Sequence, residues 1–550
     1  MIGILSFVGF TALVALIAYL ATRKTDESTA DGFYLGGRSL TAVTIAGSLL
    51  LTNLSTEQIV GLNGQAFTEG ILVMAWETLA AIAMVVTALF LLPKYLKKGL
   101  TTIPEFVENR FDGTTKTFIT ILFLSGYVVV LLPSILYSGS LALSTIFDIP
   151  EMLGISKNAA LWITIWSIGI IGMIYAIFGG LKAVAVSDLI NAIGLFIGGL
   201  MIPIFGLYII GDNDVLEGIH ILYSSYPEKF DAKGDVTNTI PFGTIFTGMM
   251  LVQLFYWGTN QAIVQRVFAA KNLKEGQKGL LLAAFVKILG PLIVVVPGII
   301  AFHFFQGNLD SPDEAYPALV QKVLPVSLVG FFAAVLFGAI LSSFNSALNS
   351  AATLFGFDLY KQYIKKNASE KQTVKAGKVF GVFLALLGMT IAPFIQYAPD
   401  GLFSWLQEAN GCYTIPILSI VVIGFTTKYV PAIAAKVGLI SGVVLYSISQ
   451  FFMKPIFIDN ALTDAQLNGV SSEADLALVT AEAYPHFLHV MAILFVINIT
   501  LMLLIGKLYP RKDAYAVKNS GAVDTSRWKY ASIVGILTIL IVVSTYIIFN

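Results

Sequence analysis

The sequence predicts an all-α membrane protein with about 14 transmembrane helices, built around two five-helix repeats of opposite orientation. Three observations predict this class. Hydrophobic residues make up 57% of the 550 residues and charged residues only 12%, whereas soluble domains carry about 25% charge. The Lys and Arg side chains fall in alternate loops between the apolar segments. Two of the apolar segments are interrupted by polar residues at corresponding places in the chain.

The apolar segments are long enough to cross a bilayer, which takes about 20 residues of helix. The first segment is predicted to be a retained span, because Arg23 and Lys24 follow it and no cationic region precedes it. The predicted spans are residues 3–21, 41–67, 70–93, 116–146, 159–179, 187–211, 242–268, 275–305, 326–362, 375–396, 400–426, 430–452, 484–508 and 530–549.

The positive charges predict the orientation of these spans. Of the 33 Lys and Arg residues, 27 fall in one set of alternate loops, among them Arg266 and Lys271, and Lys287 lies within a span. Loops rich in Lys and Arg stay in the cytoplasm, so both termini are predicted to be extracellular or periplasmic, in a multi-pass protein of the plasma (inner) membrane. Five cations fall on the opposite side: Lys157, Lys229, Lys233, Lys322 and Lys454.

Polar residues interrupt the spans 41–67 and 242–268, at 52–58 and 253–261. A polar stretch inside a bilayer must face protein, water or a ligand, although such a stretch could also belong to a loop. Each interrupted span opens a block of five spans, 41–211 and 242–426. Because five is odd, the two blocks have opposite orientation, and paired interruptions of this kind indicate the midplane binding site of a secondary transporter.

Further polar side chains within spans could line such a site. Glu77, Gln253, Asn260, Lys287 and Gln407 offer hydrogen-bond donors and acceptors. Aromatic residues stand close to them in the sequence, so that the hydroxyl groups of a sugar could pair with the polar groups while its C–H faces stack on rings. The alternative is that Glu77 and Lys287 form an ion pair that only fixes the positions of two helices. The aromatic residues are Trp76, Phe255, Tyr256, Trp257 and Phe403.

A second polar cluster lies in the span 326–362. Ala339, Ser342, Ser343 and Ser346 fall on one face of a helix. Hydroxyls and the carbonyls of an unwound helix are the hard oxygen ligands that a small cation prefers. Serines in a membrane helix also bond back to preceding carbonyls, which is the alternative interpretation.

Other classes of function find little support. A single cysteine, Cys412, excludes an internal disulfide, and the four scattered histidines do not suggest a metal site. Within the spans we find no metal-ligand spacing, nucleophile motif or phosphate loop, so an enzyme is not expected. The polar groups concentrate at one depth, unlike the continuous polar lining of a channel. No nucleic-acid partner and no cofactor are expected.

The chain resembles the solute:sodium symporters, and among them the sodium/sugar symporters, from about Gly32 to Thr426. The resemblance implies a LeuT-type fold with two inverted five-helix repeats. It divides the chain into an extra N-terminal helix and cytoplasmic loop (1–40), the first repeat (41–211), an extracellular loop (212–241), the second repeat (242–426) and three further helices (427–550). The segments that carry the resemblance are YLGGRS (34–39), NLSTEQIVG (53–61), TIPEF (102–106), GGLKAVAVSD (179–188), YWGTNQAIVQRVFAAK (256–271), AFVK (284–287) and SSFNSALNS (342–350).

The resemblance also implies roles for individual residues. The carbonyls of Leu51, Leu54 and Ala339 and the hydroxyls of Ser342 and Ser343 would hold sodium. A second sodium ion would involve Asp188, Asn345 and Ser346, together with Ser342. The expected substrate-binding residues are Gln58, Glu77, Gln253, Tyr256, Asn260, Lys287 and Gln407. The expected gates are Tyr256, steadied by Asn53, on the inner side and Leu62, Trp76 and Phe403 on the outer side.

The function implied is sodium-coupled import of a monosaccharide, a hexose such as galactose or glucose, by alternating access. A galactose-transporting family member has Asn, Ser, Asn and Tyr where this chain has Gln253, Ala80, Leu131 and Trp76, so some hydroxyl contacts differ. The alternative is a sodium symporter for myo-inositol, a sialic acid or an amino acid. The expected partners are therefore the solute, Na⁺ and the lipid bilayer.

Overall fold

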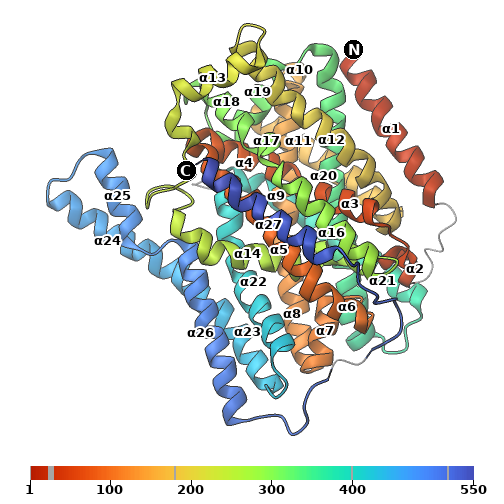
Figure 1. The fold of residues 1–550 in the computed structure, drawn as a ribbon. Helices are drawn as coiled ribbons and strands as arrows, with labels where there is room; N and C mark the ends of the chain where they lie inside the picture. The colour runs from red at the N-terminus through yellow and green to blue at the C-terminus, as the bar shows by residue number, and fades with distance from the viewer. Residues whose placement is uncertain (1, 23–29, 179–180, 398–400, 517–518, 550) are drawn as a thin grey trace.

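The computed structural model describes residues 2–22, 30–178, 181–397, 401–516 and 519–549, and these ranges consist of helices and their connections. Arg23, Lys24 and Lys518 of the charge pattern, and Gly179 and Gly180 of the segment 179–188, lie outside the described residues. Figure 1 shows the helices gathered into one bundle, from which the pair α24–α25 projects to one side.

The first half of the chain forms spans that are often assembled from two helical pieces. The single turns of π-helix η3 (Thr87–Leu91) and η4 (Tyr127–Leu131) join α5 to α6 and α8 to α9 without a break in direction. The helices are α1 (Ile2–Thr22), α2 (Ala30–Leu35), α3 (Ala42–Asn53), α4 (Thr56–Glu69), α5 (Ala75–Val86), α6 (Leu92–Lys98), α7 (Ile103–Arg110), α8 (Gly113–Gly126), α9 (Leu132–Ile146), α10 (Ile149–Leu153), α11 (Lys157–Phe178), α12 (Leu181–Ile210) and α13 (Val215–Ser225), with the 3₁₀ turns η1 (Gly36–Arg38) and η2 (Gly70–Met74).

The second half begins after a loop that contains η5 (Pro227–Phe230) and η6 (Phe242–Phe246). Its helices are α14 (Gly248–Gly258), α15 (Gln261–Phe268), α16 (Leu273–Ile288), α17 (Pro291–Val294), α18 (Val296–Phe305), α19 (Ala315–Val323), α20 (Val326–Leu354), α21 (Glu370–Ile391), α22 (Gly401–Thr426), α23 (Ala432–Ser447), α24 (Lys454–Leu467), α25 (Glu473–Ala483), α26 (Phe487–Leu508) and α27 (Ala531–Ile548), with the shorter turns η7 (Pro312–Glu314), η8 (Phe355–Ile364), η9 (Ala392–Tyr397) and η10 (Ile448–Met453).

Each of the fourteen predicted spans falls largely on helix, with residue 179 of the span 159–179 and residue 400 of the span 400–426 outside the described residues. By length and composition alone, ten described helices could cross a membrane, or eleven if α16 and α17–α18, which meet at a 47° bend, count as one span. The three spans missing from that number are α1, of which only Ser6–Ala21 is counted, and the two interrupted helices, whose halves are short or joined to a neighbour. Helix α4 is counted together with the next span as one long helix, Thr56–Lys98.

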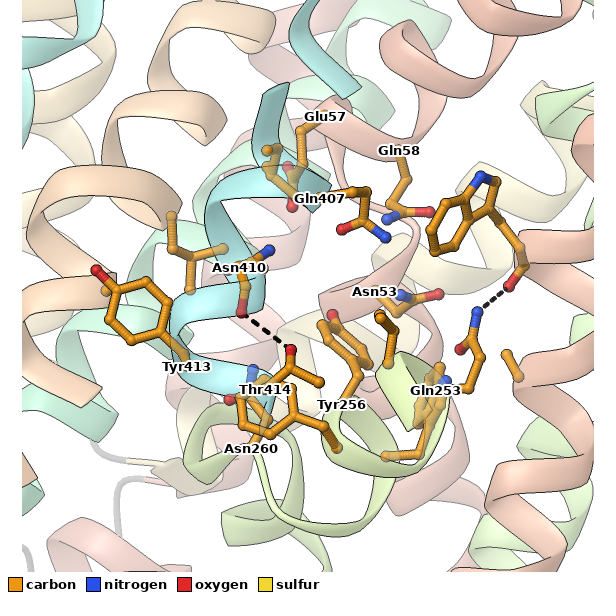
Figure 2. Close-up of a pocket in the computed structure, with 18 of the residues that line it drawn as sticks. Asn53, Glu57, Gln58, Gln253, Tyr256, Asn260, Gln407, Asn410, Tyr413 and Thr414 are labelled. Atoms are coloured by element: carbon orange, nitrogen blue, oxygen red, sulfur yellow. Dashed lines mark hydrogen bonds between the residues drawn. The ribbon is translucent and has the colours of Figure 1, made fainter. Parts of the chain in front are cut away.

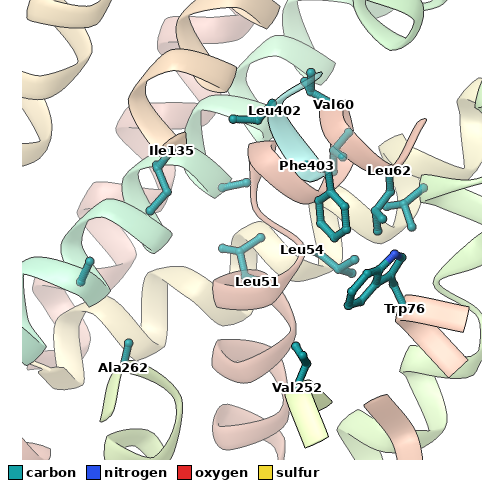
Figure 3. Close-up of a cluster of buried hydrophobic side chains, with 14 of the residues drawn as sticks. Leu51, Leu54, Val60, Leu62, Trp76, Ile135, Val252, Ala262, Leu402 and Phe403 are labelled. Atoms are coloured by element: carbon teal, nitrogen blue, oxygen red, sulfur yellow. The ribbon is translucent and has the colours of Figure 1, made fainter. Parts of the chain in front are cut away.

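Both predicted interruptions are confirmed as breaks within the bundle rather than external loops. Helix α3 ends at Asn53 and α4 begins at Thr56, while α14 ends at Gly258 and α15 begins at Gln261. Helix α3 packs against α12, α16 and α20, and α4 packs against α9, α18, α19 and α22. The broken helix α3–α4 therefore lies at the centre of the bundle, surrounded by buried apolar side chains (Figure 3).

Candidate functional site

The break between α3 and α4 follows from its sequence. Asn, Ser and Thr compete with helical hydrogen bonds by bonding to nearby backbone, and here they occur as Asn53, Ser55 and Thr56. Leu54 has a non-helical backbone (φ −75°, ψ 54°), and Ser55 is extended (φ −84°, ψ 177°). Among the described residues, no backbone N–H outside the helices bonds to the carbonyls of Leu51 or Leu54. These two oxygens are therefore free to bind a cation.

Helix α20 brings its serines to this break. The Ser343 hydroxyl donates to the Thr52 carbonyl at 3.2 Å, at the end of α3. Ser342 is buried, and its hydroxyl oxygen has no hydrogen-bond partner among the described residues. Ala339 lies one turn earlier on the same helix and is fully buried. The donor set is neutral oxygen in a buried place, which fits a sodium ion as transported cargo.

Two of the residues predicted for a second sodium ion, Asp188 and Ser346, contact a buried arginine. Arg266 was expected in a cytoplasmic loop, and that expectation is wrong, because its side chain is fully buried on α15. The guanidinium donates to Ser48 Oγ at 2.8 Å and to Ser346 Oγ, and its Nη2 lies 3.6 Å from Asp188 Oδ2. Neither amide atom of the buried Asn345 has a partner among the described residues. Arg266 compensates part of the charge of Asp188, while Asp188 Oδ1 has no hydrogen-bond partner among the described residues, so the second sodium site stays a prediction.

The predicted substrate residues surround a cavity between α4, α5, α8, α14, α16 and α22. The cavity encloses about 890 Å³ of space, including its open side. Figure 2 shows side chains from these helices converging on it. The predicted residues that line it are Asn53, Gln58, Trp76, Glu77, Gln253, Tyr256, Asn260, Lys287, Phe403 and Gln407.

Glu77 and Lys287 form a buried ion pair at one wall of the cavity, each with a side chain only 1% exposed. The Lys287 ammonium donates to Glu77 Oε1, and it also lies 5.9 Å from the centre of the Trp257 ring. Gly290, at the bend after α16, provides the space for this carboxylate, because a Cβ there would stand 2.3 Å from Glu77 Oε2. That oxygen has no described partner and remains available to a ligand.

Two predicted polar residues use part of their hydrogen-bonding capacity within the protein. Gln253 Nε2 donates to the Trp76 carbonyl at 2.8 Å, which ties α14 to α5. Asn260 caps α15, since its side-chain oxygen accepts from the Ala262 N–H at 3.0 Å. Both residues thus hold the wall of the cavity, and each keeps the other end of its amide for a ligand.

Of the predicted gate residues, Asn53, Trp76, Tyr256 and Phe403 line the cavity. The Trp76 and Phe403 rings meet edge to face, with centroids 5.3 Å apart. Gly61 allows this closure, because a Cβ at that position would stand 2.8 Å from Phe403 Cβ. Asn53 and Tyr256 lie near each other on the cavity wall (Figure 2), and their role as inner gate stays a prediction. Leu62 is fully buried in the apolar cluster of Figure 3 and does not line the cavity.

The cavity also has lining residues that the sequence did not single out. Helix α8 and the turn η4 contribute Phe123, Gly126 and Tyr127, and α22 continues past Gln407 with Asn410, Tyr413 and Thr414. Glu57 lines the cavity as well, next to Gln58 at the start of α4. The spacing of Gln407, Asn410 and Thr414 along one helical face could have revealed the α22 residues.

Known proteins with this architecture supply the decisive comparison. The sequence model of the sodium:solute symporter family matches residues 33–442, about three quarters of the chain. The chain belongs to the sodium:solute symporter family. An uncharacterized symporter of Escherichia coli K12, YidK, is 46% identical over 99% of this chain and 90% of its own length. A sodium/glucose cotransporter of Vibrio parahaemolyticus is 33% identical over 80% of this chain and 84% of its own length.

Two further known proteins are similar to this symporter at lower sequence identity. The human sodium/myo-inositol cotransporter is 30% identical over 79% of this chain, which spans 64% of that protein. A solved Na⁺-coupled sialic acid symporter, in a substrate-bound outward-open state, aligns with a TM-score of 0.72 over 94% of this chain and 99% of its own, at 18% identity. The fold is therefore the LeuT type expected from the sequence, and the protein is a multi-pass transporter of a family that couples solutes to sodium.

Proposed function

We propose that this symporter imports a hexose such as galactose or glucose together with sodium by alternating access. The observation that carries the proposal is the lining of the central cavity. Amide and carboxylate groups converge there with the rings of Trp76, Tyr256 and Phe403. The positive charge of Lys287 is already compensated by Glu77, so the wall offers polar contacts to hydroxyl groups rather than an open cation to an acid. Sodium/glucose and sodium/myo-inositol cotransporters among the relatives support a polyhydroxyl solute.

The broken helix α3–α4 connects the two ligands in this proposal. Its carbonyls at Leu51 and Leu54 would bind sodium together with Ala339, Ser342 and Ser343 on α20, and Gln58 would bind the sugar. A ligand shifts a conformational equilibrium only when it binds one state more tightly, and a sodium site shared by two helices does so if the helices separate. Sugar binding would then close Trp76 and Phe403 above the solute, and the cytoplasmic side would open past Tyr256.

One sodium ion per sugar is enough for useful uptake. Moving one charge across about 100 mV supplies roughly 2.3 kcal/mol. A tenfold sodium gradient adds about 1.4 kcal/mol, and together these support accumulation on the order of 500-fold.

The test is uptake into proteoliposomes made with the purified protein. Galactose, glucose, myo-inositol, proline and sialic acid are compared with an inward sodium gradient, with the gradient collapsed by an ionophore, and with potassium in place of sodium. We expect a hexose to accumulate only with the gradient. Uptake that ignores sodium contradicts symport, and sodium-driven uptake of myo-inositol, proline or sialic acid alone selects the alternative substrate.

The cavity itself is tested by a matched pair of glutamines on α4. Gln58→Ala should abolish sugar counterflow, because it removes a lining amide. Gln65→Ala should leave counterflow intact, since Gln65 bonds to Thr239 at the external end of the same helix, outside the cavity. Equal counterflow in the two variants contradicts the site.

A further inference from the structure

Glu57 lines the cavity but has no role in the transport cycle proposed above. It is the second residue of α4, directly after the break, and its side chain points toward the cavity beside Gln58 and Gln407 (Figure 2). The residue is only 5% exposed, and its Oε2 has no hydrogen-bond partner among the described residues. A buried carboxylate with a free oxygen in a binding cavity requires a partner.

The acidic side chains that line the cavity outnumber the basic ones among the described residues. Of the described residues that line it, Glu57 and Glu77 are negative and Lys287 is positive. Lys287 is bonded to Glu77, so its charge is already compensated. Arg266 is engaged with Asp188 and with serine hydroxyls beneath the cavity, and it does not line the wall. Glu57 is therefore the acidic side chain of this wall that has no basic partner among the described residues.

Physical chemistry favours a cationic group as the missing partner. An enclosed carboxylate loses its hydration, and this cost is recovered only by hydrogen bonds or an opposite charge. Because Glu57 lies in the first turn of α4, the partial positive charge of the helix N-terminus supports its ionised form. The oxygens proposed for sodium are on α3 and α20, and none of them belongs to Glu57. The group that meets Glu57 is then supplied by the transported solute.

We propose that Glu57 makes the cavity select hydroxyl-rich solutes that carry a protonated amine, namely amino sugars or amino polyols, over neutral and acidic ones. This inference rests on the proposed function and narrows its substrate class. The amine donates to Glu57 in a charge-assisted hydrogen bond, which is stronger than the bond from a neutral hydroxyl. An acidic sugar is repelled by the same carboxylate, since Lys287 is not free to attract it.

The test measures competition for counterflow of radiolabelled galactose or glucose in proteoliposomes. Each hexose is compared with its 2-amino and 6-amino counterparts, with the N-acetyl derivatives, which retain the nitrogen without the charge, and with the uronic acid. For the amine position that meets Glu57, we expect competition at about tenfold lower concentration than for the parent hexose. The N-acetyl derivative should lose this advantage, and the uronic acids should not compete.

Two substitutions assign the selectivity to Glu57. Glu57→Gln preserves the shape of the side chain, and we expect its competition series to show no advantage of any amine over the parent hexose. Glu69→Gln is the matched control on the same helix, because Glu69 bonds to Asn238 at the external end and lies outside the cavity. It should keep the full advantage. Should Glu57→Gln fail to fold, the comparison of amine with N-acetyl derivative in the unmodified protein decides the proposal.

The outcomes separate this inference from the proposed function. If hexoses are transported but no amine competes better than its parent, or if Glu57→Gln keeps the advantage, the inference is overturned and sugar symport stands. An effect of Glu57→Gln on the sodium requirement alone also overturns it, because Glu57 then serves the ion. If the protein transports no hexose, hexosamine or amino polyol, both proposals fail.

Discussion

At the residue scale, substitutions in the Glu77–Lys287 pair can distinguish an effect on stability from an effect on transport. Both side chains are buried, so removing one partner leaves an unpaired charge inside the protein. We expect Glu77→Gln or Lys287→Met alone to lower the free energy of unfolding by about 3–5 kcal/mol. The double substitution should cost less than either single one, because no charge remains.

The measurement is unfolding of the purified variants in detergent, followed by tryptophan fluorescence, together with sugar counterflow. All three variants should lose counterflow if both residues contact the solute. A double variant that is restored in stability and also transports would mean that the pair only fixes the positions of α5 and α16.

Ser343 provides the residue-scale test of the sodium site. Its hydroxyl bridges α20 to the Thr52 carbonyl, next to the free carbonyls of the break. Ser343→Ala removes one oxygen ligand, and we expect the sodium concentration for half-maximal uptake to rise by about tenfold. Ser350→Ala, two turns further along α20, is the control, because Ser350 bonds to Gln265 instead. Equal sodium requirements in the two variants would remove Ser343 from the site.

The sequence predicted the lining of the cavity best where a polar residue stands alone in an apolar span. Glu77, Lys287 and Gln253 could be recognised because lipid does not tolerate such side chains. Glu57 could not, since Ser55, Thr56 and Gln58 are equally polar and only the fold decides which side chain faces the cavity. Arg266 was misassigned because cations near the end of a span usually lie in a loop. Its partner Asp188 is far away in the sequence.

At the element scale, the segment 306–325 is attached to α22 next to Phe403, a proposed outer-gate residue. The turn η7 packs against α4 so closely that a Cβ at Gly64 would stand 2.7 Å from the Pro312 carbonyl oxygen. Asp313, in the same turn, accepts a hydrogen bond from the Leu402 N–H at 3.2 Å. Leu402 precedes the gate residue Phe403. Movement of α22 is thereby coupled to the segment 306–325.

This attachment should depend on pH. Burial raises the pKa of Asp313 from its ordinary 3.8 to about 6, and the adjacent Glu314 contributes in the same direction. The docked segment therefore binds the proton more tightly than the undocked one. Docking is strongest below about pH 4 and weakens as the pH rises through 6, by about 3 kcal/mol in total. Tyr137 on α9 and Lys157, which pairs with Glu314, are the other ionisable groups nearby.

Hydrogen exchange of residues 311–323, corrected for intrinsic rates, measures this effect. We expect greater protection at pH 5 than at pH 7.5 in the unmodified protein, and no such difference in Asp313→Asn. Asp310→Asn is the control, because Asp310 is exposed in the same loop and pairs with Lys157. A pH dependence that survives in Asp313→Asn would assign it to another group.

Helices and their breaks were predictable at this scale for different reasons. Apolar length locates the spans, and clusters of Asn, Ser and Thr locate the break at 54–55, because both signals are local. The turns of π-helix η3, η4, η8 and η10 carry no comparable local signal. The continuation of α23 through η10 into α24 also has no local signal, because the sequence of α24 is polar enough to resemble a loop.

At the scale of the whole molecule, the uneven distribution of cations bears on the packing of the helices as well as on their orientation. Some cations of the lysine- and arginine-rich side are buried and bonded rather than solvated. Arg110 donates to the carbonyls of Gly424 and Val430, and Lys116 pairs with Glu108 and Asp358. These contacts join α7 and α8 to α22 and η8 at one end of the bundle. The positive-inside rule counts charges near the ends of spans wherever they point, so the prediction of orientation does not depend on exposure.

The orientation is the last prediction, and it is decided by chemical labelling. Two single-cysteine proteins are made in a Cys412→Ser background. Leu467→Cys lies at the tip of the α24–α25 hairpin, where Leu467 is 81% exposed, and Lys365→Cys lies in the exposed linker between η8 and α21. We expect a membrane-impermeant maleimide to label position 467 in intact cells and position 365 only after permeabilisation, because the alternating charges put 365 in the cytoplasm. The reverse result would place both termini in the cytoplasm, and the sodium site would then release its ion outward when it opens past Tyr256.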